Sequence, residues 1–167
     1  MSAVDLARSS LDVGDIAQAI TLIVAWATRN DVQQDTMRRA RCRLPRGHVW
    51  LLARLASSEP TRLSDLATSL GVDQSTLTPQ AQRLECDGLI AREPDPRDRR
   101  AALLRVTQAG QRLLCRLHSA RRATFDALLE DWSESDRAQA AEVLNRLAER
   151  LDVSCQRYLG PATTVAP

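Results

Sequence analysis

The chain has 167 residues, of which 44% are hydrophobic, 26% charged and only 3% aromatic. This length suits one folded domain with a proper core and excludes two large ones. The formal net charge of +2 is too small to identify a nucleic-acid-binding protein by itself, so the distribution of the charges has to decide.

Helix-forming residues occur throughout the chain and predict a mostly helical protein. Residues 1–18 have no basic segment followed by an apolar one, so no secretory signal is expected. The apolar segment 16–27 is too short to cross a bilayer, and the protein is expected to be cytoplasmic. No C-x-x-C pair occurs, so neither a metal site nor a cofactor is expected. The widely separated cysteines are Cys42, Cys86, Cys115 and Cys155.

The first expected element is one long helix. From Val13 onward, apolar residues recur at steps of three and four, which predicts a single buried stripe. Asp12 or Asp15 is the candidate N-cap. This helix should run into a basic cluster that acidic residues do not interrupt. A solvated surface and a phosphate contact explain the cluster equally well. Its members are Arg38, Arg39, Arg41, Arg43 and Arg46.

Three shorter helices are expected next. The first covers 45–56, and the second opens at Ser64, whose hydroxyl can cap it, and stops at Gly71. The third covers 73–87. Its inner stripe is formed by Leu77, Ala81 and Leu84. Two short helices joined by a tight turn that contains glycine predict a helix-turn-helix.

A small β-structure should follow the helix-turn-helix. Residues 89–93 and 100–106 read as strands joined by a turn at 94–99, and a third strand is expected near 61–63. This pattern predicts a two-stranded wing.

Two long helices should complete the fold. Thr107 is the expected cap of the first helix. Ser133 and Asp136 have the capping-box spacing at the start of the second helix, and residues 160–167 are expected to be a disordered tail. The residues that these last helices should bury include Phe125, Ala141, Leu144, Leu147, Leu151 and Tyr158.

The third short helix presents polar groups that hydrogen-bond base edges and phosphates: Ser75, Thr76, Thr78, Gln80, Gln82 and Arg83. An ordinary polar helix surface would explain them about as well, and the wing decides between the two interpretations. Arg97, Arg99 and Arg100 crowd its tip, where their mutual repulsion is unfavourable and a narrow minor groove would favour them.

Four motifs carry a resemblance to the multiple antibiotic resistance regulator (MarR) family over about residues 44–117. They are GVDQSTLTP at 71–79, LECDGLI at 84–90, DPRDRR at 95–100 and VTQAG at 106–110. The resemblance implies a bacterial homodimer that binds palindromic promoter DNA, commonly as a repressor, and is released by a small ligand or an oxidant. It also implies that Asp98 orients Arg100 so that the guanidinium enters the minor groove, with Arg97 and Arg99 beside it.

The fold class expected is therefore mainly α with a small β-wing: a winged helix-turn-helix domain plus N- and C-terminal dimerisation helices. The expected boundaries are 1–43 for the N-terminal dimerisation helix, 44–106 for the winged helix-turn-helix domain, 107–159 for the C-terminal dimerisation helices and 160–167 for the tail.

Pro79 departs from the family pattern. Inside a helix it removes one N–H group and should cost about 3 kcal/mol. The sequence TLTP at 76–79 resembles the organic-peroxide sensors of the family, which implies a tolerated bend and shifts base reading toward Thr76, Thr78, Gln80 and Arg83. The early reactive cysteine of that subgroup is missing, since no cysteine precedes Cys42. Oxidant sensing by Cys42 or Cys115 remains an alternative.

An effector pocket is expected where the dimerisation helices meet the winged domain, near Trp26, Arg46, His48 and Trp50, although ordinary packing would also explain these residues. An enzyme is not expected, because only His48 and His118 are histidines and no phosphate-binding loop or nucleophile–base motif occurs. The remaining alternative is a helical partner-binding protein that keeps a winged domain without specific DNA binding. Pro79 favours that alternative and the Arg-rich wing tip opposes it.

Overall fold

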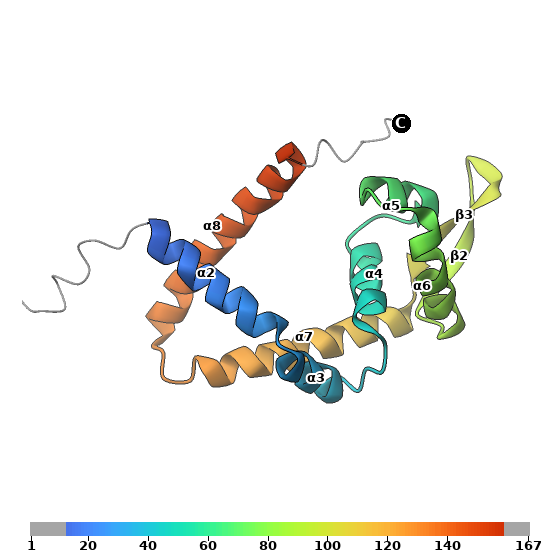
Figure 1. Cartoon of the computed structure of the whole chain (residues 1–167). Coiled ribbons are helices and arrows are strands. Elements are labelled where there is room, and N and C mark those ends of the chain that lie inside the picture. The colour runs from blue at the N-terminus through green and yellow to red at the C-terminus, as the bar shows by residue number, and fades with distance from the viewer. Residues whose placement is uncertain (1–12, 159–167) are drawn as a thin grey trace, which may run out of the picture.

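The computed structural model describes residues 13–158, except for the side chains of residues 99 and 151–158. Long helices form one side of the molecule and a winged domain forms the other (Figure 1). The elements are α2 (Val13–Thr28), α3 (Asn30–Arg39), α4 (Arg46–Ala56), β1 (Thr61–Arg62), α5 (Leu63–Ser69), α6 (Gln74–Cys86), β2 (Ile90–Asp95), β3 (Asp98–Val106), α7 (Gln108–Leu128) and α8 (Glu134–Tyr158). The expected fold class, mainly helical with a small β-wing, is confirmed.

Some expectations fall outside the described part of the chain. They concern the cap at Asp12, the tail at 160–167 and the burial of Leu151 and Tyr158. None of the helices in the part that is described combines the length and the apolar character needed to cross a membrane.

The single long N-terminal helix is a wrong prediction, because the helix is interrupted at Arg29. This residue has an extended backbone, with φ −57° and ψ 140°. Its guanidinium donates to both carboxylate oxygens of Asp31, at 3.0 and 2.7 Å. The Arg29 N–H still bonds to the Trp26 carbonyl and the Gln33 N–H bonds to the Arg29 carbonyl. The break therefore leaves few backbone groups without a partner.

The helix-turn-helix forms as expected. Gly71 has φ +63°, a left-handed conformation that glycine adopts without the steric cost of a side chain. The inner stripe of α6 is confirmed, because Leu77, Ala81 and Leu84 are all buried. The cap at Ser64 is a wrong prediction. Strand β1 runs directly into α5, which begins at Leu63, and the Ser64 hydroxyl donates to Asp65 instead.

The three-stranded sheet has the order β1-β3-β2, with both pairings antiparallel. The short strand expected near 61–63 is confirmed as β1. The wing strands are longer than expected, because β2 extends to Asp95 and β3 already begins at Asp98. The core lies between this sheet and the helices. Its largest fully buried side chains are Leu51, Leu52, Leu84, Leu104 and Leu117.

Both predicted caps of the long C-terminal helices are confirmed. The Thr107 hydroxyl oxygen accepts from the Gly110 N–H and donates to the Gly88 carbonyl. The Asp136 N–H donates to the Ser133 hydroxyl, which donates in turn to the Asp136 carboxylate. Thr107 therefore fixes the start of α7 against the turn before the wing.

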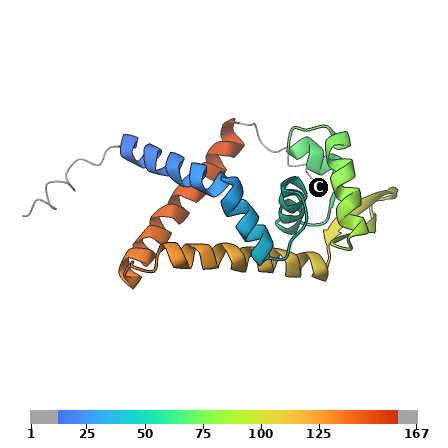
Figure 2. The ribbon, with the colours of Figure 1, turned by 60° about the horizontal axis from the view of Figure 1, so that its bottom comes forward.

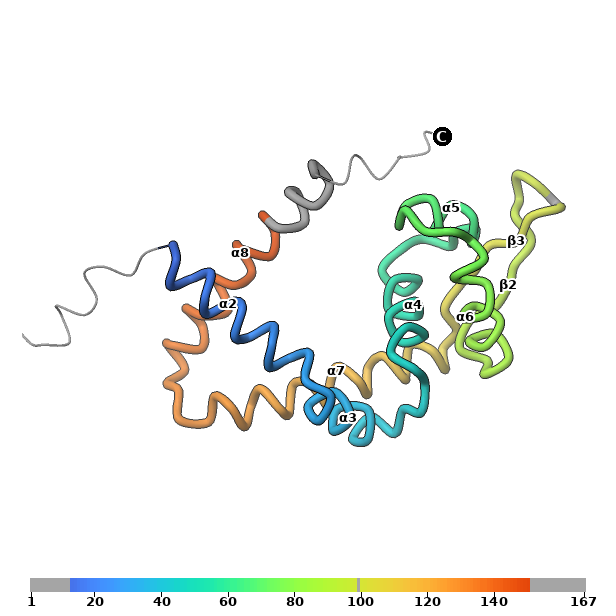
Figure 3. Tube along the Cα trace, viewed as in Figure 1, coloured from blue at the N-terminus to red at the C-terminus, as the bar shows by residue number. Residues whose placement is uncertain are grey.

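The apolar stripes of α2 and α8 are not buried within the chain. No residue of α2 is buried, and Ala141 and Leu144, expected in a core, are exposed. Phe125 of α7 is also 46% exposed. Figures 2 and 3 place α2 and α8 near the far end of α7, away from the winged domain. The predicted burial of these stripes is therefore not reached within a single chain, and their burial against a second copy stays a prediction.

Candidate nucleic-acid interface

Helix α6 presents an exposed polar face at the edge of the molecule. Ser75, Thr76, Gln82 and Arg83 are exposed on it. Thr78 is half-buried, and its hydroxyl donates to the Gln74 carbonyl at 2.9 Å. Four of the six predicted recognition residues therefore lie where a ligand can reach them.

Gln80 lies at the contact between α4 and α6. A Cβ atom added to Gly47 would lie 3.4 Å from its Oε1, and this oxygen is buried without a hydrogen-bond partner. The Nε2 group donates to the Thr76 carbonyl of the same helix at 3.3 Å. The Gln80 side chain is therefore half-buried, and its predicted role in base reading stays a prediction.

The cation on the exposed face of α6 is paired. Arg83 Nε lies 3.0 Å from the Asp87 carboxylate, one turn further along the helix. A second pair joins α6 to the wing, because Arg92 Nε of β2 donates to Glu85 at 2.8 Å. Such exposed pairs add little stability in water, so Arg83 can exchange its partner for a phosphate or a base.

Pro79 lies inside α6 without interrupting it. The helix runs through all 13 residues from Gln74 to Cys86, and Pro79 is exposed. Because proline has no N–H group, the Ser75 carbonyl has no helical donor four residues later. Ser75 and Pro79 are both exposed, so the missing hydrogen bond lies at the surface of the domain and not in its core.

The wing tip presents two exposed cations, Arg97 and Arg100, and neither forms a salt bridge within the described residues. The Asp98 carboxylate accepts the backbone N–H of Arg100 at 3.0 Å. The resemblance implied that Asp98 orients the Arg100 guanidinium. In the structure Asp98 holds the backbone of Arg100 while the Arg100 side chain is exposed, and the orienting role of Asp98 on DNA stays a prediction.

A buried carboxylate behind the tip was missed by the sequence analysis. Asp95 is only 6% exposed. Its Oδ1 accepts the Arg97 N–H at 2.8 Å, and its Oδ2 lies 2.6 Å from both Nε and Nη2 of Arg62. The Asp98 carboxylate is 3.8 Å from the same guanidinium. No local pattern reveals this contact, because Arg62 and Asp95 are 33 residues apart.

These donors set the ionisation of the carboxyl group. The Arg97 N–H and then the Arg62 guanidinium lower the pKa of Asp95 below its ordinary value, although its burial opposes this. A lowered pKa in the folded state means that the ionised group stabilises the wing at neutral pH. This contribution is lost only as the pH falls through the lowered pKa.

The four residues of the expected effector pocket do not line one common cavity. Trp26 packs edge-on against Phe125, with ring centroids 5.8 Å apart, and lines a cavity of about 90 Å³ between α2, α3 and α7. Arg46, His48 and Trp50 of α4 do not line this cavity. Known small-molecule sites have volumes of roughly 300 Å³ or more, so this cavity would have to enlarge to hold an effector.

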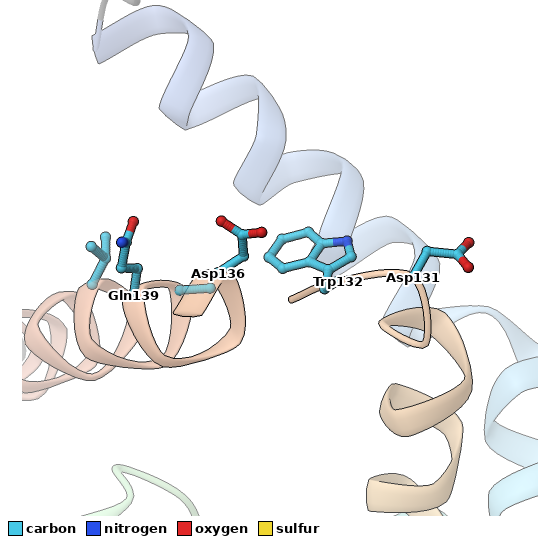
Figure 4. A pocket seen from close by; sticks show the side chains of 6 residues that line it. Asp131, Trp132, Asp136 and Gln139 are labelled. Carbon is cyan, nitrogen blue, oxygen red and sulfur yellow. The ribbon is translucent and has the colours of Figure 1, made fainter. Parts of the chain in front are cut away.

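A larger, open hollow lies at the turn between α7 and α8 (Figure 4). Its volume is about 480 Å³, and Trp132, Asp131 and Asp136 line it together with residues of the first turns of α8. Trp132 is 45% exposed. This tryptophan adds to the apolar surface that the single chain leaves uncovered.

The cysteines do not form a cluster with other metal-binding side chains among the described residues. Cys42 is half-buried and packs against the core, whereas Cys86 and Cys115 are exposed. The side chain of Cys155 lies outside the described part.

Comparisons with known proteins agree on one family. Residues 44–102 match the model of the MarR family. The chain is 34% identical to the uncharacterized HTH-type transcriptional regulator YxaD of Bacillus subtilis, over 71% of this chain and 83% of that protein. It is 31% identical to the HTH-type transcriptional repressor MdtR of the same organism, over 60% of this chain and 65% of that protein. The crystal structure of MarR is similar with a TM-score of 0.63 and 26% identity, covering 89% of this chain and 99% of that one.

Proposed function

This chain belongs to the MarR family of transcriptional regulators, and we propose that it binds a palindromic operator in double-stranded DNA as a homodimer. The observation that carries the proposal is the pairing of two features in one domain. The exposed polar face of α6 lies beside a wing whose tip cations, Arg97 and Arg100, form no salt bridge in the described structure. Figure 1 shows the wing projecting beyond α6 at the same edge of the molecule.

The two features suit the two grooves of DNA. A helix fits the major groove, where Ser75, Thr76 and Gln82 can hydrogen-bond base edges or phosphates. The wing tip would then reach the adjacent minor groove, whose negative potential favours arginine. Gln80 is half-buried against α4, and its buried Oε1 has no hydrogen-bond partner, so its side chain would have to rotate outward to read a base.

The homodimer is supported by the apolar surface that one chain leaves exposed. Val143 and Leu144 of α8 are 60% and 53% exposed, and several residues of α2 are similarly uncovered. Contiguous apolar surface of this kind marks an interface. A twofold dimer would present two copies of α6 to DNA, and such symmetry matches a palindromic operator.

Repression and release are the finer parts of the proposal. A dimer bound across a promoter excludes other proteins from the same DNA, so repression is expected where the operator overlaps the promoter. The cavity beside Trp26 lies between α2, α3 and α7. A ligand that enlarged it would bias the arrangement of these helices and thereby the spacing of the two winged domains.

The first test is a fluorescence-anisotropy titration of the full chain against the promoter region next to its own gene, at several salt concentrations. Binding that is salt-sensitive and survives competition by random DNA supports the proposal. Binding no tighter than to random DNA, together with capture of a protein partner through the wing, would favour the partner-binding alternative instead.

Arg100→Ala is expected to weaken binding to operator and random DNA alike, by about tenfold at moderate salt, because a wing-tip cation acts mainly through electrostatics. The matched control is Arg112→Ala. It removes the same charge from the exposed surface near the start of α7, at the opposite end of the hairpin from the tip. Equal affinities of Arg100→Ala and the wild type at matched salt would remove the wing from the mechanism.

A further inference from the structure

We propose that Arg62 is a positioning residue that fixes the wing relative to the helix-turn-helix through Asp95, so that the tip arginines meet DNA at one angle. The proposal rests on the proposed DNA-binding function. It assigns a role to an ion pair that lies behind the interface.

Arg62 lies where two parts of the domain meet. It is the last residue of β1 and occupies the N-cap position of α5, so its backbone belongs to the helix-turn-helix. Its guanidinium belongs to the wing, because it lies 2.6 Å from Asp95 at the end of β2 and 3.8 Å from Asp98 at the start of β3. One side chain therefore connects the body of the domain to both strands of the hairpin.

Backbone pairing alone leaves the tip far from this body. Strand β1 pairs with β3 only at Leu104 and Leu103. The tip begins five residues before Leu103, about 16 Å along an extended strand. A bulge between Pro94 and Asp95 interrupts the register of β2 before it reaches the tip. The hairpin end therefore depends on other contacts to hold its direction.

On the α6 side, the Arg92–Glu85 pair holds the wing at the third residue of β2, well before the tip. Closer to the tip, an open pocket of about 220 Å³ lies between the first residues of α5 and α6 and the wing, and it is lined by Arg62, Leu63, Ser64, Gln74, Arg92 and two alanines of β3. The ion pair between Arg62 and Asp95 forms beside this space. Because Asp95 is buried, its interaction with Arg62 is less screened by salt and water than a surface pair.

The carboxylate transmits the position of Arg62 to the tip. Its two oxygens have different partners, since Oδ1 accepts the Arg97 N–H and Oδ2 accepts from Arg62. Each of these two hydrogen bonds restricts the rotation of the Asp95 carboxylate and so keeps the other oxygen directed at its own partner. Arg97 and Arg100 would thus be presented in an orientation that depends on Arg62.

The proposal and simple electrostatics predict opposite effects of Asp95→Asn on the affinity for DNA. Asp95→Asn removes a negative charge next to the tip, which by itself should strengthen DNA binding. Asparagine can still accept the Arg97 N–H through Oδ1 but cannot pair with the Arg62 charge. If Arg62 positions the wing, Asp95→Asn should instead weaken binding about five- to tenfold.

The experiment measures DNA affinity for Asp95→Asn, Arg62→Gln and the double variant, with Glu59→Gln as the control. Glu59 is exposed, and its substitution raises the net charge by the same amount without touching the wing. Both single variants should weaken binding five- to tenfold, and the double variant should be no weaker than the worse single one. Glu59→Gln should bind at least as tightly as the wild type.

Two further readouts separate positioning from a general loss of stability. In a background that carries both Arg97→Ala and Arg100→Ala, Asp95→Asn should cost no more than twofold, because the contacts that it positions are already lost, whereas general destabilisation would add in full. Amide hydrogen exchange in the wing should become about tenfold faster in both single variants, with exchange in α6 and α7 unchanged.

Tighter DNA binding by Asp95→Asn would overturn the proposal. It would also fail if Arg62→Gln alone weakened binding and lowered the salt dependence by about one phosphate contact, since Arg62 would then be a direct ligand. If the wild type did not bind DNA specifically, the proposed function would fail. Hydrogen exchange would still decide whether Arg62 fixes the wing, because unchanged exchange in both variants contradicts it.

Discussion

Leu144→Glu should convert the protein from a dimer to a monomer and abolish specific DNA binding at submicromolar concentration. Leu144 is 53% exposed on α8 and lies on the same helix face as Ala140 and Leu147. A carboxylate placed there would be desolvated without a partner in the proposed interface. The two symmetric copies, at about 2 kcal/mol each, would raise the dimer dissociation constant about a thousandfold.

The matched control is Asn145→Glu, which adds the same charge one residue later. In a helix, successive side chains are about 100° apart, so position 145 faces away from the stripe formed by Ala140, Leu144 and Leu147. Light scattering after size-exclusion chromatography gives the mass, and anisotropy gives the affinity for operator DNA. A Leu144→Glu protein that remains dimeric would show that α8 does not form the interface.

Gly110→Ala should lower the free energy of unfolding by about 3 kcal/mol. A Cβ atom at Gly110 would lie 2.3 Å from the Leu89 carbonyl oxygen and 2.7 Å from a Val106 methyl group. Because the closer atom belongs to the backbone, α7 would have to shift away from the base of the wing. This penalty exceeds the gain of about 1 kcal/mol that alanine brings to a helix over glycine.

Urea denaturation at one fixed protein concentration measures this effect, since the stability of a dimer depends on concentration. Gly47→Ala is the control. Its Cβ would meet only the end of the Gln80 side chain, at 3.4 Å, so its stability should stay within about 1 kcal/mol of the wild type. Equal stability of Gly110→Ala and the wild type would show that α7 does not dock as closely as the structure indicates.

Local signals in the sequence predicted local structure well. The caps at Thr107 and Ser133 and the turn at Gly71 depend on residues a few positions apart, and all three are confirmed. The start of α5 was placed one residue late because Ser64 is a good cap in isolation. The strand pairing of Arg62 takes precedence over that preference.

The features that the sequence did not predict depend on distant partners. Gln80 has the polarity of a base reader, but its position around the helix turns it toward Gly47. The contact between Arg62 and Asp95 spans 33 residues and requires the sheet to form first. For the proposed interface, polarity singled out α6, and tertiary packing decided which of its residues are exposed.

The extended residue between α2 and α3 has a mechanical consequence. Helix α2 has 16 residues and is therefore about 24 Å long, with its whole length on one side of Arg29. A rotation of about 10° at this joint moves the far end of α2 by about 4 Å, slightly more than the 3.4 Å rise between successive bases of one strand. The Arg29–Asp31 pair is solvent-exposed and resists such a rotation only weakly. In a dimer assembled through α2, one pair of backbone dihedral angles would thus adjust the separation of the two DNA-reading helices by about one base-pair step.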